Sequence, residues 1–407
     1  MRSRITQFFV PVLVFLFLTG CNSAIFQRTM LQVKAHTALE SKKYDEAVAL
    51  YEELLKESPD NATALRGIGR AYVEIGKGPE AVAALEKARK IDPNDKGTDL
   101  YLGLAYTLTE EYGKAIDVWK AYALQEPDSY VTARIVKQMT VLLHKESSRW
   151  AKEAVKGEKA LKGKPGDPNT VAVTYFGDRG IRERIRPLQK AMADMIITDL
   201  AKAPSIAVVE RVKMQKLLEE LKLGTTGIVD PKTAPRVGRL VGAGRVVTGN
   251  MAGLSEAVMR VDSVVMDVGT VKDAGRQEAQ GPVDEFFKIE KAIVFGILDD
   301  LGVSLTPQER SAMGRYATTS YTAIKYYGEG LDAQDRKDWD LAIRLFLRSS
   351  EADPQGPGAK ALTTAPSTAQ ANATVLGLVG DVTAASEADE ARAKAAAAQS
   401  GGSGGGH

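Results

Sequence analysis

The sequence contains few of the residues from which most catalytic and metal sites are built. Its 407 residues include one Cys and three His, and aromatic residues make up only 6% of the chain. A single Cys excludes an intramolecular disulfide, and three histidines are little material for a zinc site or a Ser-His-Asp triad. No phosphate-binding Gly-x-x-x-x-Gly-Lys-Ser/Thr loop is present. We therefore expect no metal, no cofactor and no enzymatic activity.

An excess of charge of either sign is also absent. The 54 Lys and Arg stand against 52 Asp and Glu, and loss of Arg2 and Arg4 with an N-terminal leader would make the two numbers equal. A balanced surface gives no electrostatic reason to expect nucleic acid or anionic lipid as a partner. With 44% apolar and 26% charged residues, the composition is that of globular domains. The length predicts two or three of them.

The most hydrophobic run of the chain lies at the N-terminus. It extends from Phe8 to Leu18 and is interrupted by Pro11. A bilayer-spanning helix needs about 20 residues, so this run is too short to span. Together with the basic residues before it, the run predicts a secretory signal peptide over residues 1–20.

The signal peptide ends in Leu18-Thr19-Gly20-Cys21, which resembles the lipobox of bacterial lipoproteins. The resemblance implies that Cys21 is acylated and becomes the new N-terminus, with residues 21–27 as a tether. Asn22 resembles an outer-membrane sorting residue. The expected location is therefore the outer membrane, by a lipid anchor facing the periplasm. The alternative is an ordinary signal peptide that happens to end near a Cys.

A repeat with a period of 34 residues follows the tether. Four kinds of position recur at this spacing. They are a closing proline (Pro59, Pro93 and Pro127), a small residue (Ala47, Ala81 and Ala115), a glycine that lets helices pack closely (Gly69 and Gly103) and a large apolar residue (Tyr51, Leu85 and Trp119). The pattern resembles the tetratricopeptide (TPR) repeat. It predicts an all-α array of helical hairpins over residues 28–161, with three repeats and a capping helix from about Tyr130 to Leu161.

TPR arrays bind proteins on the concave face that the first helix of each repeat forms. In the register above, this face includes Gln32, His36, Arg66, Arg70, Leu100 and Leu104. Arg66 and Arg70 are four residues apart on one helical face and could hold a carboxylate of a partner peptide. Each of these residues, taken singly, could equally belong to a solvated helix surface.

One more unit with the same internal spacing lies far from the array. Gly330, Trp339, Ala342, Phe346 and Pro354 repeat the offsets of the third repeat. Residues 323–354 are therefore predicted to form an isolated TPR-like hairpin. A lone repeat cannot bury both of its faces, so it must dock on the middle domain, on the array or on another subunit.

The middle of the chain reads as an α/β domain. Strands are predicted over 170–175 and 205–210, helices over 186–201, 211–221 and 232–241, then a meander of strands over 245–251, 257–268 and 274–280, and a closing helix over 283–301. Four segments resemble the CsgG family of curli-production assembly and transport lipoproteins: Phe176-Gly177-Asp178, Val208-Val209-Glu210-Arg211, Leu240-Val241-Gly242-Ala243 and Val246-Val247-Thr248-Gly249. The resemblance implies a CsgG-like domain with a mixed sheet over residues 167–303.

The same resemblance implies a ring-shaped secretion pore, but two features of this chain depart from the pore-forming members. Those members insert transmembrane hairpins into the meander, whereas here only Gly269–Asp273 and a similarly short segment near Leu254 separate the predicted strands. The loop after the first strand, 180–186, is charged instead of aromatic. We take Glu210 to be a structural residue, favourable at a helix N-terminus.

These patterns lead to an α+β multidomain protein: a TPR array, a CsgG-like domain, one further TPR-like hairpin and a flexible Ala/Gly-rich tail over residues 355–407, with one Ala-rich helix over 384–398. We expect an outer-membrane lipoprotein that binds proteins and assembles an envelope or secretion complex. A homo-oligomer through the CsgG-like domain is possible. The alternatives are a subunit of a CsgG-type secretion channel exporting fibre or polysaccharide and, since carboxylates are plentiful, an envelope hydrolase.

Overall fold

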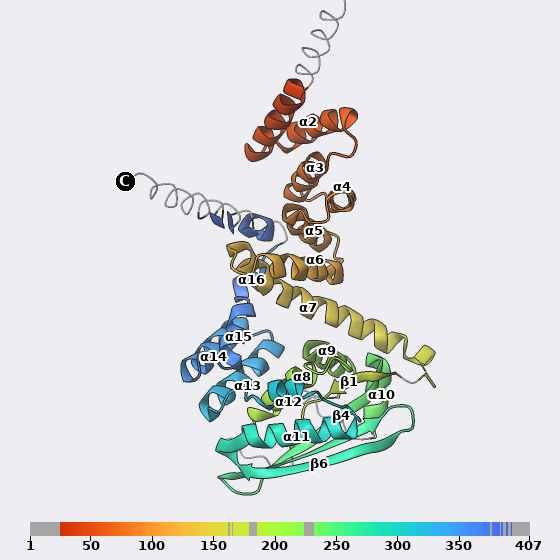
Figure 1. The fold of residues 1–407 in the computed structure, drawn as a ribbon, viewed down its shortest axis with the longest axis vertical. Coiled ribbons are helices and arrows are strands. Elements are labelled where there is room, and N and C mark those ends of the chain that lie inside the picture. The colour runs from red at the N-terminus through yellow and green to blue at the C-terminus, as the bar shows by residue number, and fades with distance from the viewer. Residues whose placement is uncertain are drawn as a thin grey trace, which may run out of the picture. The chain divides into compact units, whose positions relative to one another are not determined.

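The computed structural model describes residues 25–161, 163–164, 166–178, 185–223, 232–374, 377–382, 384–385, 388–389 and 392. The chain divides into two compact units (Figure 1). The first comprises residues 1–139 with 373–407, and the second comprises residues 140–372. Within the described residues, no helix has both the length and the apolar character needed to cross a bilayer.

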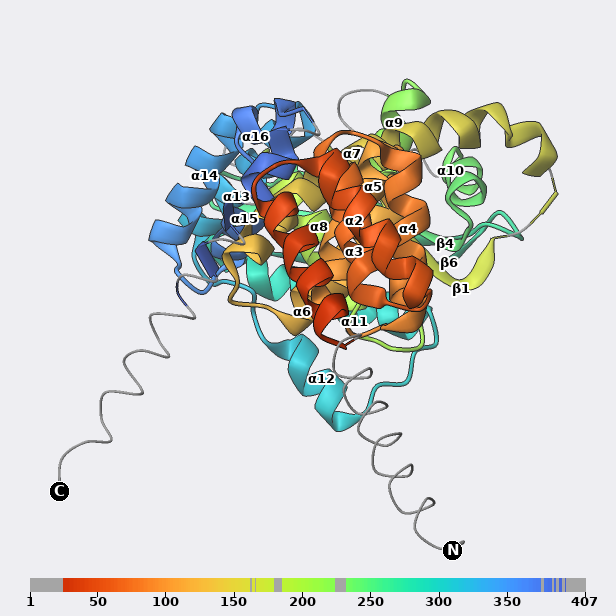
Figure 2. The ribbon, with the colours of Figure 1, turned by 90° about the horizontal axis from the view of Figure 1, so that it is seen from above.

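The first unit is built from antiparallel helical hairpins. A helix over 25–40 is followed by α2 (Tyr44–Glu57), α3 (Ala62–Glu74), α4 (Gly78–Ile91), α5 (Lys96–Leu108) and α6 (Tyr112–Gln125). Neighbouring helices such as α2, α3 and α4 lie side by side (Figures 1 and 2). The long helix α7 (Tyr130–Lys156) contributes to both units and is followed by the short helix η1 (Glu158–Leu161).

The predicted repeat is visible as a repeated packing contact. A Cβ on Gly69 would lie 2.3 Å from Cγ of Leu85, and one on Gly103 would lie 2.0 Å from Nε1 of Trp119. Each large side chain of the second helix therefore fills the space that a glycine leaves on the first. The turn between the two helices also repeats, because one residue with positive φ recurs at the same position of every unit: Lys42, Gly76, Glu110 and, in the isolated hairpin, Lys337.

The second unit contains a mixed sheet with strand order β3-β1-β4-β5-β6. Strands β1 (Asp167–Val173), β3 (Ala207–Val208) and β4 (Ala243–Gly253) are parallel, while β5 (Val258–Asp267) and β6 (Lys272–Pro282) continue from β4 as an antiparallel meander. The short β2 (Gly177–Asp178) pairs with β4. Both meander connections, 254–257 and 268–271, are tight, as the sequence predicted.

Helices cover both faces of this sheet. Val171 and Val247 point to one face, in a core shared with α8 (Leu188–Leu200) and α11 (Phe286–Asp300), which follows the short η2 (Val283–Glu285). Ala172 and Val246 point to the other face, in a core shared with α9 (Arg211–Glu220) and α10 (Ala234–Val241). Alternation along β1 and β4 thus places successive side chains in different cores.

The isolated TPR-like hairpin docks on the CsgG-like domain. After α12 (Pro307–Gly314), it consists of α13 (Tyr321–Asp335) and α14 (Trp339–Ala352). A Cβ on Gly330 would lie 2.4 Å from Cε1 of Phe346, which repeats the contact seen in the array. Ile324 and Phe346 belong to the same apolar core as α8 and α11. Of the three docking places that the sequence allowed, the structure therefore selects the middle domain.

Two predictions at the ends of the chain are wrong in part. Residues from 355 onward were expected to be a flexible linker, but α15 (Pro357–Thr364) and α16 (Thr368–Asn372) follow α14 directly. Ala365 lies in the core, and Gly358 is packed against Ser349 so closely that a Cβ would lie 2.2 Å from its Oγ. At the other end, residues 25–27 of the expected tether belong to the helix over 25–40. Most of 384–398 lies outside the described residues.

Candidate functional site

The concave side of the array contains a cavity of about 340 Å³. Five of the six predicted groove residues line it: Gln32, His36, Arg66, Arg70 and Leu100. The sixth, Leu104, is fully buried and does not contribute to the lining. Its assignment to the groove is wrong because α5 turns this position into the core between the helices. Cys21 lies outside the described residues.

The basic residues of the cavity already have acidic partners within the array. Arg66 Nη1 lies 2.6 Å from Asp95 Oδ1, and Arg70 Nη1 lies 2.6 Å from Glu40 Oε1. Lys96, which also lines the cavity, pairs with a glutamate about one repeat further on. The arginines are therefore not free to receive a partner's carboxylate, although the sequence had suggested that they could hold one. A partner would have to exchange with these ion pairs, so the cavity favours no simple acidic ligand.

Aromatic side chains complete the lining. Tyr51, Tyr101 and Tyr122 all contribute to the cavity, and the Arg70 guanidinium lies 5.4 Å from the centroid of the Tyr101 ring. The repeat register places Tyr51 in a packing position, and nothing in the spacing distinguishes the other two tyrosines as groove residues. The arrangement offers aromatic side chains beside paired charges, which suits a mixed apolar and polar protein segment.

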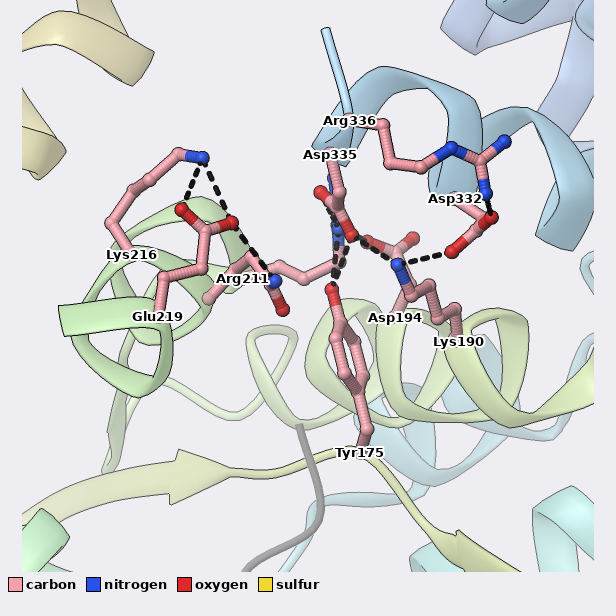
Figure 3. A network of polar contacts seen from close by, with 10 residues as sticks. Tyr175, Lys190, Asp194, Arg211, Lys216, Glu219, Asp332, Asp335 and Arg336 are labelled. Atoms are coloured by element: carbon pink, nitrogen blue, oxygen red, sulfur yellow. Dashed lines mark hydrogen bonds and ion pairs between the residues drawn. The ribbon is translucent and has the colours of Figure 1, made fainter. Parts of the chain in front are cut away.

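A second polar site lies in the other unit, where the hairpin meets the CsgG-like domain (Figure 3). Arg211, the first residue of α9, places Nη1 2.7 Å from Oδ1 of Asp335 at the end of α13. The same guanidinium donates to the Tyr175 hydroxyl at 2.6 Å, and this hydroxyl donates to Asp335 Oδ2 at 2.9 Å. Lys190 of α8 approaches Asp335 Oδ2 at 2.8 Å, and Arg211 Nε lies 3.4 Å from Asp194 Oδ1. Four separate segments therefore meet at one buried carboxylate.

The network is electrically balanced and buried. Burial alone would raise the pKa of the Asp335 carboxyl, but Arg211 and Lys190 outweigh it and lower that pKa to about 2. Burial, opposed by Arg211 and reinforced by Asp335, raises the pKa of the Tyr175 hydroxyl well above its usual value. The hydroxyl therefore stays protonated and keeps its hydrogen bond to Asp335. These residues hold the hairpin in place, since each buried charge has a partner of opposite sign.

The sequence pointed to this region, although not to Arg211. The strand-Glu-Arg-helix step was interpreted through Glu210, whereas Arg211 makes the long-range contacts. Its partner Asp335 is 124 residues away in sequence. Tyr327, on the same helix as Asp335, donates to Asp194 Oδ2 at 2.6 Å. No local spacing predicts such pairs, because they exist only once the hairpin has docked.

A cavity of about 1,020 Å³ adjoins this network within the second unit. Its lining comes from α7, α8, α9, α12, α13 and α15 and includes Asp199, Lys202, Arg211 and Tyr327. Lys202 forms an ion pair with Asp199 at 2.6 Å, so some of the charged groups that line the cavity neutralise each other. In the described part of the chain, no group of three or more His, Cys, Asp or Glu is placed to hold a metal ion.

Comparison with known proteins gives two family matches. A model described as tetratricopeptide repeat matches residues 38–97, and one described as curli production assembly/transport component CsgG matches residues 168–284. Both lie where the sequence patterns placed them, so these two predictions are confirmed.

Similar curated proteins match only a small part of their own length. The chain is 32% identical over 71 residues to Protein CTR9 homolog of Arabidopsis thaliana, covering 17% of this chain and 6% of that protein. It is 25% identical over 96 residues to the Hsp70-Hsp90 organizing protein of Triticum aestivum, covering 24% of this chain and 16% of that protein.

Solved TPR structures are also similar to this chain. The TPR domain of Arabidopsis OM64 is 24% identical and covers 25% of this chain and 84% of its own, with a TM-score of 0.25. A tetratricopeptide repeat protein from Parabacteroides merdae is 12% identical and covers 83% of this chain and 97% of its own, with a TM-score of 0.27.

Each family match covers less than half of the chain. The chain therefore contains a segment that matches the tetratricopeptide repeat model and a later segment that matches the model of the curli production assembly/transport component CsgG.

Proposed function

We propose that this protein is an outer-membrane lipoprotein, anchored through acylated Cys21 and facing the periplasm. In this proposal the array receives a protein partner and the CsgG domain joins the chain to an envelope or secretion complex. The chain itself catalyses no reaction. The sequence around Cys21 supports the anchor, since it resembles a lipobox and contains the only Cys of the chain.

The observation that carries the proposal is the cavity on the concave side of the array. It is accessible, it is lined by Gln32 and His36 from the first repeat and by Leu100 from the third, and its charges are paired within the array. A surface that spans three repeats and needs no counter-ion suits a protein segment better than a small charged ligand.

Photocrosslinking in the native envelope tests the cavity. A benzophenone amino acid at His36, an exposed cavity residue, should give a discrete adduct with another envelope protein. The matched control places the same group at Leu124, which is 84% exposed on α6 and does not line the cavity. Adducts of the same pattern from both positions, or none from His36, would contradict binding in the cavity.

Two further measurements test the rest of the proposal. Mass spectrometry of the mature N-terminus should find acyl chains on Cys21, and Cys21→Ser should release the chain into the soluble periplasmic fraction. Purified full-length chain should not conduct ions across a planar bilayer. Conduction would replace this proposal with the secretion-channel alternative.

A further inference from the structure

The first helix of the array has an apolar stripe on its outer face. Phe26, Met30 and Val33 are spaced i, i+4 and i+7 along the helix over 25–40 and are 66%, 42% and 53% exposed. At 100° per residue, these three side chains fall within one narrow sector. Thr37 extends the same sector, and its hydroxyl donates to the Val33 carbonyl at 2.8 Å, so it presents no unpaired donor.

The opposite face of the same helix is the one that packs into the array. Ala35, Ala38 and Leu39 are buried in the core of the first repeats, and Leu31 packs against them. The helix is therefore apolar on two opposite sides, although only one side has a partner within the described residues. End repeats of solenoid proteins need a polar outer face to stay soluble. An apolar outer face on an end repeat indicates that something outside the array covers it.

The distance along the chain to the predicted anchor identifies the occupant. Cys21 precedes Phe26 by five residues, which allows a separation of at most about 17 Å even if the chain is fully extended. Acyl chains on Cys21 would thus hold the stripe at the lipid surface. Helices that lie on a membrane place an apolar face about 5–10 Å into the boundary between headgroups and acyl chains. The balanced charge of the chain is consistent with a contact that is hydrophobic and not electrostatic.

We propose that Phe26, Met30 and Val33 rest on the lipid bilayer as a second attachment beside the acylated Cys21. This inference rests on the proposed anchor and adds an orientation to it. A lipid tether alone would let the array turn freely, whereas the stripe would fix the first repeat against the membrane. The other candidate for the stripe, a second copy of this chain, becomes an outcome of the test.

A fluorescent probe on the stripe tests the contact in the full-length mature protein. Cys21 is the only Cys, so Met30→Cys adds one free thiol for an environment-sensitive dye once Cys21 is acylated. In vesicles of neutral phospholipid, the dye at position 30 should shift its emission to the blue and be quenched by spin-labelled lipid. The matched control, Leu124→Cys, starts from an 84% exposed residue and should show neither effect.

Each outcome decides a different point. If Cys21 is acylated and the probe at position 30 stays in water, the bilayer contact is wrong while the anchor stands. If mass spectrometry finds no acyl chain, the dye is attached instead to Met30→Cys in a Cys21→Ser background, so that position 30 is the single thiol. Entry of that probe into lipid would mean that the anchor fails and the contact stands. A blue shift that disappears when the protein is diluted among more vesicles, without quenching by lipid, would mean that a second copy covers the stripe and would overturn the proposal.

Discussion

Removal of the Asp335 carboxylate should loosen the docking of the hairpin on the CsgG-like domain. The side chain is only 3% exposed, and in Asp335→Ala it leaves Arg211 and Lys190 facing each other without their shared partner. Breaking a buried pair by removing one member costs about 3–5 kcal/mol. Arg211 retains Asp194 at 3.4 Å, so we expect the lower end, about 3 kcal/mol. This corresponds to a change on the order of a hundredfold in an opening equilibrium.

Hydrogen exchange of the α13 amides is the suitable assay. The chain has two compact units, so one global unfolding free energy is not well defined, whereas exchange reports opening of the hairpin alone. The control is Asp332→Ala, which removes a 40% exposed carboxylate that pairs with the same Lys190 at 2.7 Å. An exposed pair of this kind is worth about 0–1 kcal/mol. Amides of α5, in the other unit, should be unaffected by either change.

The comparison between the two variants decides the question. If Asp335→Ala and Asp332→Ala accelerate exchange of α13 equally, the buried network does not hold the hairpin and the reasoning is wrong. A second variant separates the loss of the ion pair from the cost of leaving Arg211 buried without its partner. Adding Arg211→Met to Asp335→Ala removes the uncompensated cation, so the double variant should recover part of the protection. Further loss in the double variant would show that Arg211 acts through other partners.

Three more predictions concern the cores. Burial lowers the pKa of His144 to about 3, so the imidazole resists protonation in the folded state. The stability of the second unit should therefore fall as pH drops below about 6.5 towards 3. Chemical denaturation of His144→Phe should show a weaker dependence of stability on pH in this range. Burial raises the pKa of Glu290 to about 8; stability should therefore fall as pH rises from about 4.5 to 8, and denaturation of Glu290→Gln should lack this loss. Gly103→Ala would place a Cβ 2.0 Å from Nε1 of Trp119, whereas at Gly281 the nearest atom would lie at 3.7 Å. Hydrogen exchange of the surrounding amides should show a loss of about 1–3 kcal/mol for the first change and a much smaller loss for the second.

The repeat could be predicted because its contacts are encoded locally. Gly103 and Trp119 are 16 residues apart, and the contacts of Gly69 with Leu85 and of Gly330 with Phe346 have the same offset. Strand β5 was also predictable, since its buried residues alternate with more exposed ones and this alternation leaves a period of two in the sequence. Both features depend on neighbours within one hairpin, which a sequence pattern can represent.

The long-range contacts had no such pattern. Arg211 and Asp335 are 124 residues apart in sequence, so no local spacing connects them. The helix α15 was missed for a related reason, because an Ala-rich segment has the composition of a linker and becomes a helix here by packing against α14 at Gly358. The groove arginines were assigned to the right helix, but Asp95 and Glu40 neutralise them from adjacent repeats.

The isolated TPR-like hairpin shows that the concave positions of a repeat can bind a helix of the same chain. Tyr327 precedes Gly330 by three residues, as Arg66 precedes Gly69 and Leu100 precedes Gly103. In the array these positions line an accessible cavity. In the hairpin, Tyr327 instead donates to Asp194 of α8, and a Cβ on the neighbouring Gly328 would lie 1.9 Å from the Pro187 carbonyl at the start of that helix. The hairpin therefore uses this concave position to hold a helix of its own chain, whereas the corresponding positions of the array line the cavity proposed for an external partner.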